Sequence, residues 1–234
     1  MISLLAAASG MLTAPAIEPD YGSYPRDAML NGQSAAALVE IAVDPKGQRL
    51  SCVVLTVVGA NELGQDICNL QRNARFTPAQ SEVGENTYGV VRAFIKYVLA
   101  GSEQGMQIDR LVASEITFTV VGTIARRGSR PPQLESARES QIVAWPMVTF
   151  DVEALPEVDH DFVDQRVNVA IDPTGTVADC AALKQVDVKA GYGIAACQQL
   201  KGMQVTEPLS VDEQPVAHVR ALEVRFALSA KSPD

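Results

Sequence analysis

The chain has 234 residues, of which 47% are hydrophobic and 20% are charged, a composition typical of a folded globular protein with one or two domains. The formal net charge is -9, with 19 Lys plus Arg against 28 Asp plus Glu, so the chain as a whole repels phosphate backbones and no nucleic-acid partner is expected. No apolar run reaches the roughly 18 residues of a membrane-spanning helix, so we expect no membrane anchor in the mature chain.

The first residues form a short apolar stretch, MISLLAAASGML, that runs into Ala14-Pro15-Ala16. Signal peptidases accept this A-x-A pattern, and the apolar stretch is too short to cross a bilayer. We therefore predict a cleaved secretory signal over residues 1–16 and a mature chain that begins near Ile17. No Lys or Arg precedes the apolar run, which leaves two alternatives open: a translation start upstream of Met1, or a buried helix.

From residue 38 onward the residue pattern predicts two strands, a helix and a third strand. Residues 38–43 and 49–58 are rich in β-branched and apolar residues and flank the turn sequence Asp-Pro-Lys-Gly, which predicts a hairpin. Asn61 is a candidate N-cap for the helix, and Pro78 limits where that helix ends. Residues 88–99 predict a long closing strand. The apolar side chains spaced along one face of the predicted helix are Leu63, Ile67, Leu70 and Ala74.

The region after residue 100 is mixed in character. Residues 116–124, ITFTVVGTI, have strand composition and predict an additional strand in the first half or at an interface. Residues 126–132 are rich in Arg, Gly and Pro, which predicts an exposed linker; a specific anion site is the alternative role for the three arginines.

An internal repeat organises the chain. The sequence VEIAVDPKG from Val39 and the sequence VNVAIDPTG from Val167 share the pattern V-x-[IV]-A-[VI]-D-P-x-G, and in both copies a cysteine follows seven positions after the proline. We therefore predict an α+β fold of two modules, residues 17–125 and 145–234, joined by a linker over residues 126–144. In the second copy the predicted strands are residues 166–171, 177–184 and 216–228, and the predicted helix is residues 191–201.

The four cysteines fall into two local pairs with similar spacing, so we predict the disulfides Cys52–Cys68 and Cys180–Cys197. No C-x-x-C motif is present, which argues against a thioredoxin-like redox centre or a zinc ribbon. Each predicted disulfide ties a strand to the helix behind it. Closing a loop of about 17 residues should add roughly 3 kcal/mol to the stability of a module with a thin core.

Several spaced motifs of the first copy resemble the C-terminal domain of the TonB energy-transducer family. They are Tyr24-Pro25, the VEIAVDPKG hairpin, the helix with Leu63, the sequence ARFTPA over residues 74–79, and the closing strand. The second copy is more diverged: Trp145-Pro146 stands for Tyr-Pro, and the R-F-x-P-A pattern has become QVTEP. Gly64 and Gln65 also stand where the family usually carries an acidic residue.

The resemblance implies a periplasmic protein that binds a protein partner, in the family an outer-membrane transporter, by adding a strand of the partner to its sheet. The inner-membrane helix and the long Pro-rich segment of an energy transducer are not evident in this sequence, so we expect a soluble TonB-like protein. The expected partner is an outer-membrane receptor or its periplasmic segment. The first copy keeps more of the motif and is the expected recognition unit. The predicted partner-binding residues are Val90, Arg92, Phe94 and Lys96, with an ordinary polar sheet face as the alternative role of the two cations.

A second hypothesis is a structural or assembly protein whose modules pair with each other or across a homodimer. No motif indicates an enzyme, a cofactor or a metal site. An enzyme or small-ligand carrier would need a deep polar pocket, and the sequence gives no indication of one. His160 lies in an acidic loop with Asp159, Asp161 and Asp164, which we interpret as a solvated loop rather than a cation site. We interpret His218 as a sheet-face residue rather than a ligand.

Overall fold

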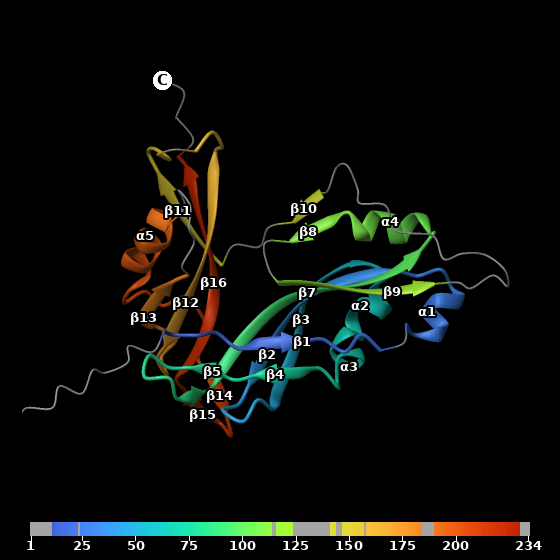
Figure 1. Ribbon diagram of the computed structural model, residues 1–234, viewed down its shortest axis with the longest axis horizontal. Coiled ribbons are helices and arrows are strands. Elements are labelled where there is room, and N and C mark those ends of the chain that lie inside the picture. The colour runs from blue at the N-terminus through green and yellow to red at the C-terminus, as the bar shows by residue number, and fades with distance from the viewer. Residues whose placement is uncertain are drawn as a thin grey trace, which may run out of the picture.

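The structure is a computed structural model that describes residues 11–22, 24–113, 116–123, 141–143, 147–156, 158–183 and 190–229. Its centre is one eight-stranded sheet with the order β13-β12-β16-β7-β2-β3, in which β11 also pairs with β16 and β9 also pairs with β7. In Figure 1 the strands β11, β12 and β16 stand upright, whereas β2, β7 and β9 run across the view, so the sheet changes direction where β7 meets β16. The strand bounds are β2 Ala35–Val43, β3 Arg49–Gly59, β7 Gly89–Ala100, β9 Ile116–Thr123, β11 Val148–Val152, β12 Phe162–Ile171, β13 Val177–Ala182 and β16 His218–Leu228.

The described residues are mostly strand with a few helices, which agrees with the predicted α+β class. The short elements around the main sheet are α1 Arg26–Leu30, α2 Asn61–Gln65, α3 Ile67–Leu70, α4 Glu103–Asp109, α5 Ala190–Leu200, β1 Ala16–Glu18, β4 Arg75–Thr77, β5 Ala79–Gln80, β6 Asn86–Thr87, β8 Leu111–Ala113, β10 Gln141–Val143, β14 Leu209–Val211 and β15 Gln214–Val216.

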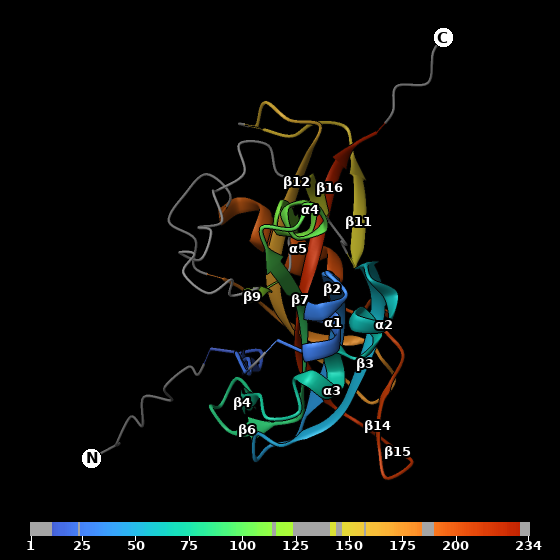
Figure 2. The same ribbon diagram turned by 90° about the vertical axis from the view of Figure 1, so that its right-hand side faces the viewer.

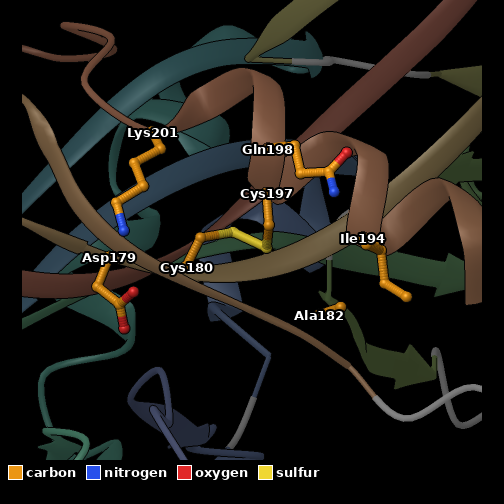
Figure 3. Close-up of a pocket in the computed structure, with 7 residues that line it drawn as sticks. All are labelled: Asp179, Cys180, Ala182, Ile194, Cys197, Gln198 and Lys201. Atoms are coloured by element: carbon orange, nitrogen blue, oxygen red, sulfur yellow. A yellow bond between two sulfur atoms is a disulfide. The ribbon is translucent and has the colours of Figure 1, made fainter.

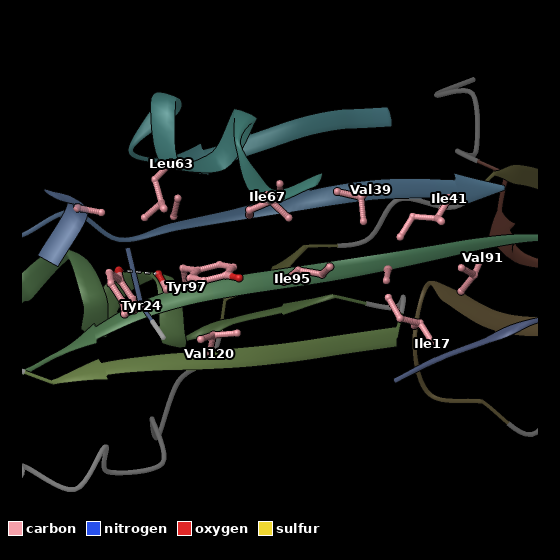
Figure 4. Packing of buried hydrophobic residues seen from close by; sticks show 14 of the residues in the cluster. Ile17, Tyr24, Val39, Ile41, Leu63, Ile67, Val91, Ile95, Tyr97 and Val120 are labelled. Atoms are coloured by element: carbon pink, nitrogen blue, oxygen red, sulfur yellow. Dashed lines mark hydrogen bonds between the residues drawn. The ribbon is translucent and has the colours of Figure 1, made fainter. Parts of the chain in front are cut away.

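The first half contains the predicted hairpin, with β2 and β3 antiparallel and β7 on the other side of β2. Alternate residues of β2 and β7 face α2 and α3 and form the larger core. Figure 4 shows side chains of this core between the sheet and the two helices. Its labelled members on the central strands are Val39, Ile41, Val91, Ile95 and Tyr97.

The single helix predicted from Asn61 to beyond Leu70 is instead two short helices that meet at Asp66. The N-cap of α2 is Ala60 rather than Asn61, and no side chain caps it. Ala74 lies outside the helices, so its predicted place on a helical face is wrong.

Tertiary pairing accounts for the early end of the helix. Strand β4 follows soon after α3 and pairs with β1 from the N-terminal segment. The side chain of Gln71, at the end of α3, donates to the backbone oxygen of Asp20 and to the hydroxyl of Tyr97. These contacts hold residues 71–77 to segments distant in sequence, and the local helical pattern does not determine them.

The second half repeats the order strand, strand, helix, strand, with β12 paired to both β13 and β16. Its first strand is longer than predicted, beginning at Phe162. The predicted strand over residues 216–228 corresponds to β16, which begins at His218, and Val216 is the last residue of β15. Residue 184, the predicted end of the second strand, lies outside the described residues. The core of this half lies between the sheet and α5 and includes Val167, Val169, Leu200, Leu222 and Val224.

The face of β7 opposite the larger core is covered by α4 and β8. Phe94 packs there with Ile108 and Leu111. Helix α4 begins at a proper N-cap, because the Ser102 hydroxyl accepts a hydrogen bond from the Gly105 backbone N–H at 2.9 Å. Strand β10 pairs in parallel with β8 and falls inside the predicted linker over residues 126–144. The basic stretch over residues 126–132 lies outside the described residues.

Residues 11–18 contact both halves of the chain. Leu12 is 2% exposed and packs with Ala79 and Val219, and its backbone oxygen accepts a hydrogen bond from Asn168 Nδ2 at 3.0 Å. Strand β1 pairs antiparallel with β4. The last residues of the predicted signal, residues 11–16, are thus packed against the fold, while residues 1–10 lie outside the described part of the chain.

These contacts lead to a stability prediction. We expect a chain that starts at Ile17 to unfold more easily than one that starts at Met11, by about 1.5–3 kcal/mol, because the truncation removes the buried Leu12 side chain. Urea unfolding followed by circular dichroism would measure the difference. In the longer chain, Leu12→Ala should reproduce most of the loss and Met11→Ala, at a half-exposed side chain, should not. Equal stability of the two chains would contradict the structural role of this segment.

Candidate interaction edge

One edge of β7 is paired with β2, and the other edge is shared by two different strands. At its start, Gly89 and Val90 pair in parallel with Val219 and Arg220 of β16. Further along, residues 93–100 pair in parallel with all eight residues of β9. Figure 1 shows β9 beside β7. The edge of the closing strand is therefore covered by segments of the same chain.

The four residues predicted to bind a partner lie on one face of β7, because residues at alternate positions of a strand point to the same side. Val90 is 4% exposed, Phe94 is 0% exposed and Lys96 is 5% exposed, and Arg92 is partly buried. The structure brings the four together on the face that carries α4, and their part in partner binding stays a prediction.

The Lys96 ammonium group lies under the end of α4. Its Nζ donates to the backbone oxygens of Asp109 at 3.0 Å and Leu111 at 2.8 Å. Burial lowers the pKa of Lys96 below its ordinary value, and the nearby charge of Asp109 opposes that shift. Lys96 therefore holds the connection from α4 to β8 against the sheet, a role that its alternation with Phe94 in the sequence does not predict.

Tyr24, of the Tyr-Pro motif, lies against β9 where that strand covers the end of β7. Its hydroxyl donates to the backbone oxygen of Gln33 at 2.6 Å, and its ring meets the ring of Tyr97 edge-on, with centroids 5.8 Å apart (Figure 4). A Cβ built on Gly122 of β9 would lie 2.4 Å from Tyr24 Cδ2. The sequence shows the motif and the strand, but it does not show that they touch.

An ion pair between a buried guanidinium and a partly exposed carboxylate joins the two halves at the start of β16. Arg220 is 1% exposed, and its guanidinium binds the carboxylate of Glu40 on β2. The same guanidinium lies 3.4 Å from the Thr206 hydroxyl and 3.5 Å from the Met147 sulfur. Sequence reasoning missed this pair, because the two residues are 180 positions apart.

His218 lies two positions before Arg220 and is 2% exposed, in agreement with a sheet-face residue. Burial, together with the charge of Arg220, lowers its pKa from 6.5 to about 4, although the Val216 backbone and Glu40 favour the protonated form.

The lowered pKa of His218 makes stability depend on pH. Between the folded-state pKa of about 4 and the ordinary value of 6.5, the folded chain binds fewer protons at His218 than the unfolded chain does. The stability of the fold therefore decreases as the pH falls through this range. We expect His218 to make the folded state less stable by about 2 kcal/mol at about pH 5 than at about pH 7.5. Urea unfolding at both pH values would measure it. His218→Gln should reduce the loss, whereas His160→Gln, at an exposed side chain, should not; an unchanged loss in His218→Gln would contradict the assignment.

The acidic loop does not gather its side chains around one point. Asp159, His160 and Asp161 are exposed, and Asp164 pairs with Arg225 through two hydrogen bonds of 2.7 Å. That pair raises the pKa of Arg225. Among the residues that the structure describes, no group of three or more His, Cys, Asp or Glu side chains could hold a metal ion.

Both predicted disulfides are present, Cys52–Cys68 and Cys180–Cys197. The second lines a surface groove of about 320 Å³ between β13 and α5. Figure 3 shows Asp179 and Lys201 at one end of this groove and Ile194 and Ala182 at the other. Each disulfide ties the second strand of a hairpin to the helix behind the sheet.

The helices of the described part of the chain are too short or too polar to cross a bilayer.

Residues 20–99 match the family model described as Gram-negative bacterial TonB protein C-terminal. No curated protein and no solved structure gave a match. The matched segment runs from the residues before Tyr24 to the end of β7, and it includes neither β9 nor the second half. Domains of this family are non-enzymatic protein-interaction modules of the bacterial envelope, linked to outer-membrane transport. Residues 20–99 of this chain are therefore similar to the TonB C-terminal domain.

Proposed function

We propose that this chain is a TonB-like periplasmic protein that binds an extended segment of a partner protein by strand addition to β7, in the place that β9 holds when no partner is bound. The observation that carries the proposal is the parallel pairing of β9 along residues 93–100 of the domain's closing strand. In strand addition, main-chain hydrogen bonds provide affinity and alternate side chains provide selectivity. The partner is a protein of the envelope, with an outer-membrane receptor or its periplasmic segment as the leading class.

The pairing of β9 supports its replacement by another strand. Within the described residues β9 pairs with β7 alone, and Thr117, Val121 and Thr123 on it are exposed. A partner strand that takes its place forms the same kind of main-chain hydrogen bonds with β7. Whether a partner strand replaces β9 therefore depends on the side chains of the two strands and on the free-energy cost of ordering the partner segment.

The compartment is the second part of the proposal. Two disulfides fit an oxidising environment, and the apolar N-terminal stretch with its A-x-A pattern is the proposed export signal. Because residues 11–16 pack against the fold, we infer that N-terminal sequencing of the protein from its native compartment is the decisive measurement of where processing occurs.

A structural or assembly role is the second candidate, and a specific observation favours it. β16 pairs with β7, Arg220 binds Glu40, and β11 pairs in parallel with β16 as β9 does with β7; Figure 2 shows β11 beside β16. In this alternative the closing strands of the two proposed modules, β7 and β16, pair with each other. The strands β9 and β11 then cover the remaining edges permanently. A homodimer would then need a different surface, and light scattering would detect it.

A lock on β9 distinguishes the two candidates. Val98 and Val121 lie opposite each other in the β7–β9 register, so Val98→Cys with Val121→Cys places two cysteines to join the strands. Peptide mapping of the unreduced protein would first establish the engineered bond. Immobilised chains would then be exposed to periplasmic and outer-membrane extracts, with each single cysteine variant as a control.

We expect the locked chain to lose at least about nine-tenths of the partner that the wild-type chain captures, because the β7 edge stays closed while the rest of the surface is unchanged. Gly122→Val, which crowds Tyr24 and weakens β9, should increase capture. Equal capture by the locked and wild-type chains would contradict strand addition at β7 and favour the structural role.

A further inference from the structure

We infer that Tyr24 selects the partner segment by requiring a glycine at the position that Gly122 occupies in β9. This inference rests on the proposed function, because it takes β9 as the chain's own copy of the bound segment. The partner segment is then an extended, uncharged stretch with apolar residues at alternate positions and a glycine two positions after the last of them.

The alternation is set by the face of the sheet that β9 extends. Ile116, Phe118 and Val120 pack against the larger core, and Val120 is 3% exposed. A charged side chain at the position of Val120 would be buried in this apolar core, and one at Ile116 or Phe118 would be partly buried there, which is costly unless the charge is paired. The intervening positions tolerate polar residues, since Thr117 and Thr123 are exposed there.

The glycine requirement comes from the Tyr24 ring. A Cβ on Gly122 would lie 2.4 Å from Tyr24 Cδ2 and 2.5 Å from Cγ, so even alanine meets the ring. The φ angle of Gly122 is not among the positive values of the chain, so the backbone itself would accept other residues at this position. The neighbour, rather than the backbone conformation, excludes a side chain.

The ring has little freedom to move away. The Tyr24 hydroxyl donates to the Gln33 backbone oxygen, and Tyr97, which the ring contacts edge-on, accepts a hydrogen bond from the buried side chain of Gln71. Tyr24 is 8% exposed. The surrounding contacts hold the ring over the strand that pairs with the end of β7.

Two peptides would test the selection. The receptor is the full chain with Val120→Asp, which weakens β9 by placing a charge at its buried position rather than through the contact with Tyr24. The first probe is a fluorescent peptide with the sequence of residues 116–123, and the second has alanine at the position of Gly122. Fluorescence anisotropy measures the affinity of each, and circular dichroism establishes that each receptor variant is folded.

We expect the glycine peptide to bind about tenfold or more tightly than the alanine peptide, because overpacking a closed contact is costly. Adding Tyr24→Ala to the receptor should reduce this ratio to about twofold or less, whereas Tyr24→Phe, which keeps the ring, should preserve it. The ratio between two peptides on one receptor is unaffected by a general loss of receptor stability.

The binding results distinguish failure of the proposed function from failure of the glycine requirement. If neither peptide binds the folded Val120→Asp chain, the proposed function is overturned, and the inference with it. If both peptides bind with equal affinity, strand addition stands and the glycine requirement is overturned. If the preference for glycine persists in Tyr24→Ala, Tyr24 is not the selecting residue.

Discussion

Arg220→Ala is expected to lower the free energy of unfolding by about 2–3 kcal/mol, the range for losing a hydrogen bond between charged groups together with the packing of a buried side chain. The guanidinium is almost fully buried and binds Glu40, whose side chain is 33% exposed. The substitution removes both the ion pair and the packing of a long side chain against Met147. The loss falls at the place where β16 meets β7, so the variant should also weaken the joining of the two halves.

Urea unfolding followed by circular dichroism would measure this effect. Arg225→Ala is the matched control, since Arg225 lies on the same strand in a partly exposed pair with Asp164, and we expect it to cost about 1 kcal/mol. Arg220→Met, which keeps most of the apolar volume, should cost less than Arg220→Ala. If Arg220→Ala and Arg225→Ala had equal effects, the pair between Arg220 and Glu40 would not be a principal link between the halves.

Removing either disulfide is expected to cost about 3 kcal/mol, because each bond closes a loop of similar length in the unfolded chain. The sequence separations are 16 for Cys52–Cys68 and 17 for Cys180–Cys197, so the chain-entropy contributions are nearly equal. Each disulfide also holds a helical segment that contains glycine, with Gly64 in α2 and with Gly191 and Gly193 in α5. Glycine weakens a helix by about 1 kcal/mol relative to alanine.

Each double variant should therefore loosen the helices that its disulfide holds, α2 and α3 in Cys52→Ala with Cys68→Ala and α5 in Cys180→Ala with Cys197→Ala. Thermal unfolding gives the overall loss, and amide hydrogen exchange locates it in the chain. Unchanged protection of α2 and α3 in the first variant and of α5 in the second would contradict this expectation. A loss below about 1 kcal/mol for both variants would show that the disulfides contribute little to folding.

Local patterns in the sequence determined much of this protein. The hairpin β2–β3 follows from two apolar, β-branched runs around Asp-Pro-Lys-Gly, and the two disulfides follow from the repeated spacing of the cysteines. The resemblance to the TonB C-terminal domain depends on motifs within residues 24–99, and the family match covers residues 20–99. In each case the deciding interactions lie within one hairpin, one loop or one module, where spacing along the chain is informative.

The tertiary structure alone decided how these elements meet. The composition of residues 116–124 predicts a strand. Main-chain hydrogen bonds have the same donors and acceptors in every strand, so the sequence does not indicate that this strand pairs with β7. The contact between Tyr24 and Gly122 and the ion pair between Arg220 and Glu40 join residues far apart in sequence. The helix predicted from Asn61 ends early because pairing with the N-terminal segment outweighs a weak local propensity. The candidate edge is therefore a property of strand order, which only the folded chain specifies.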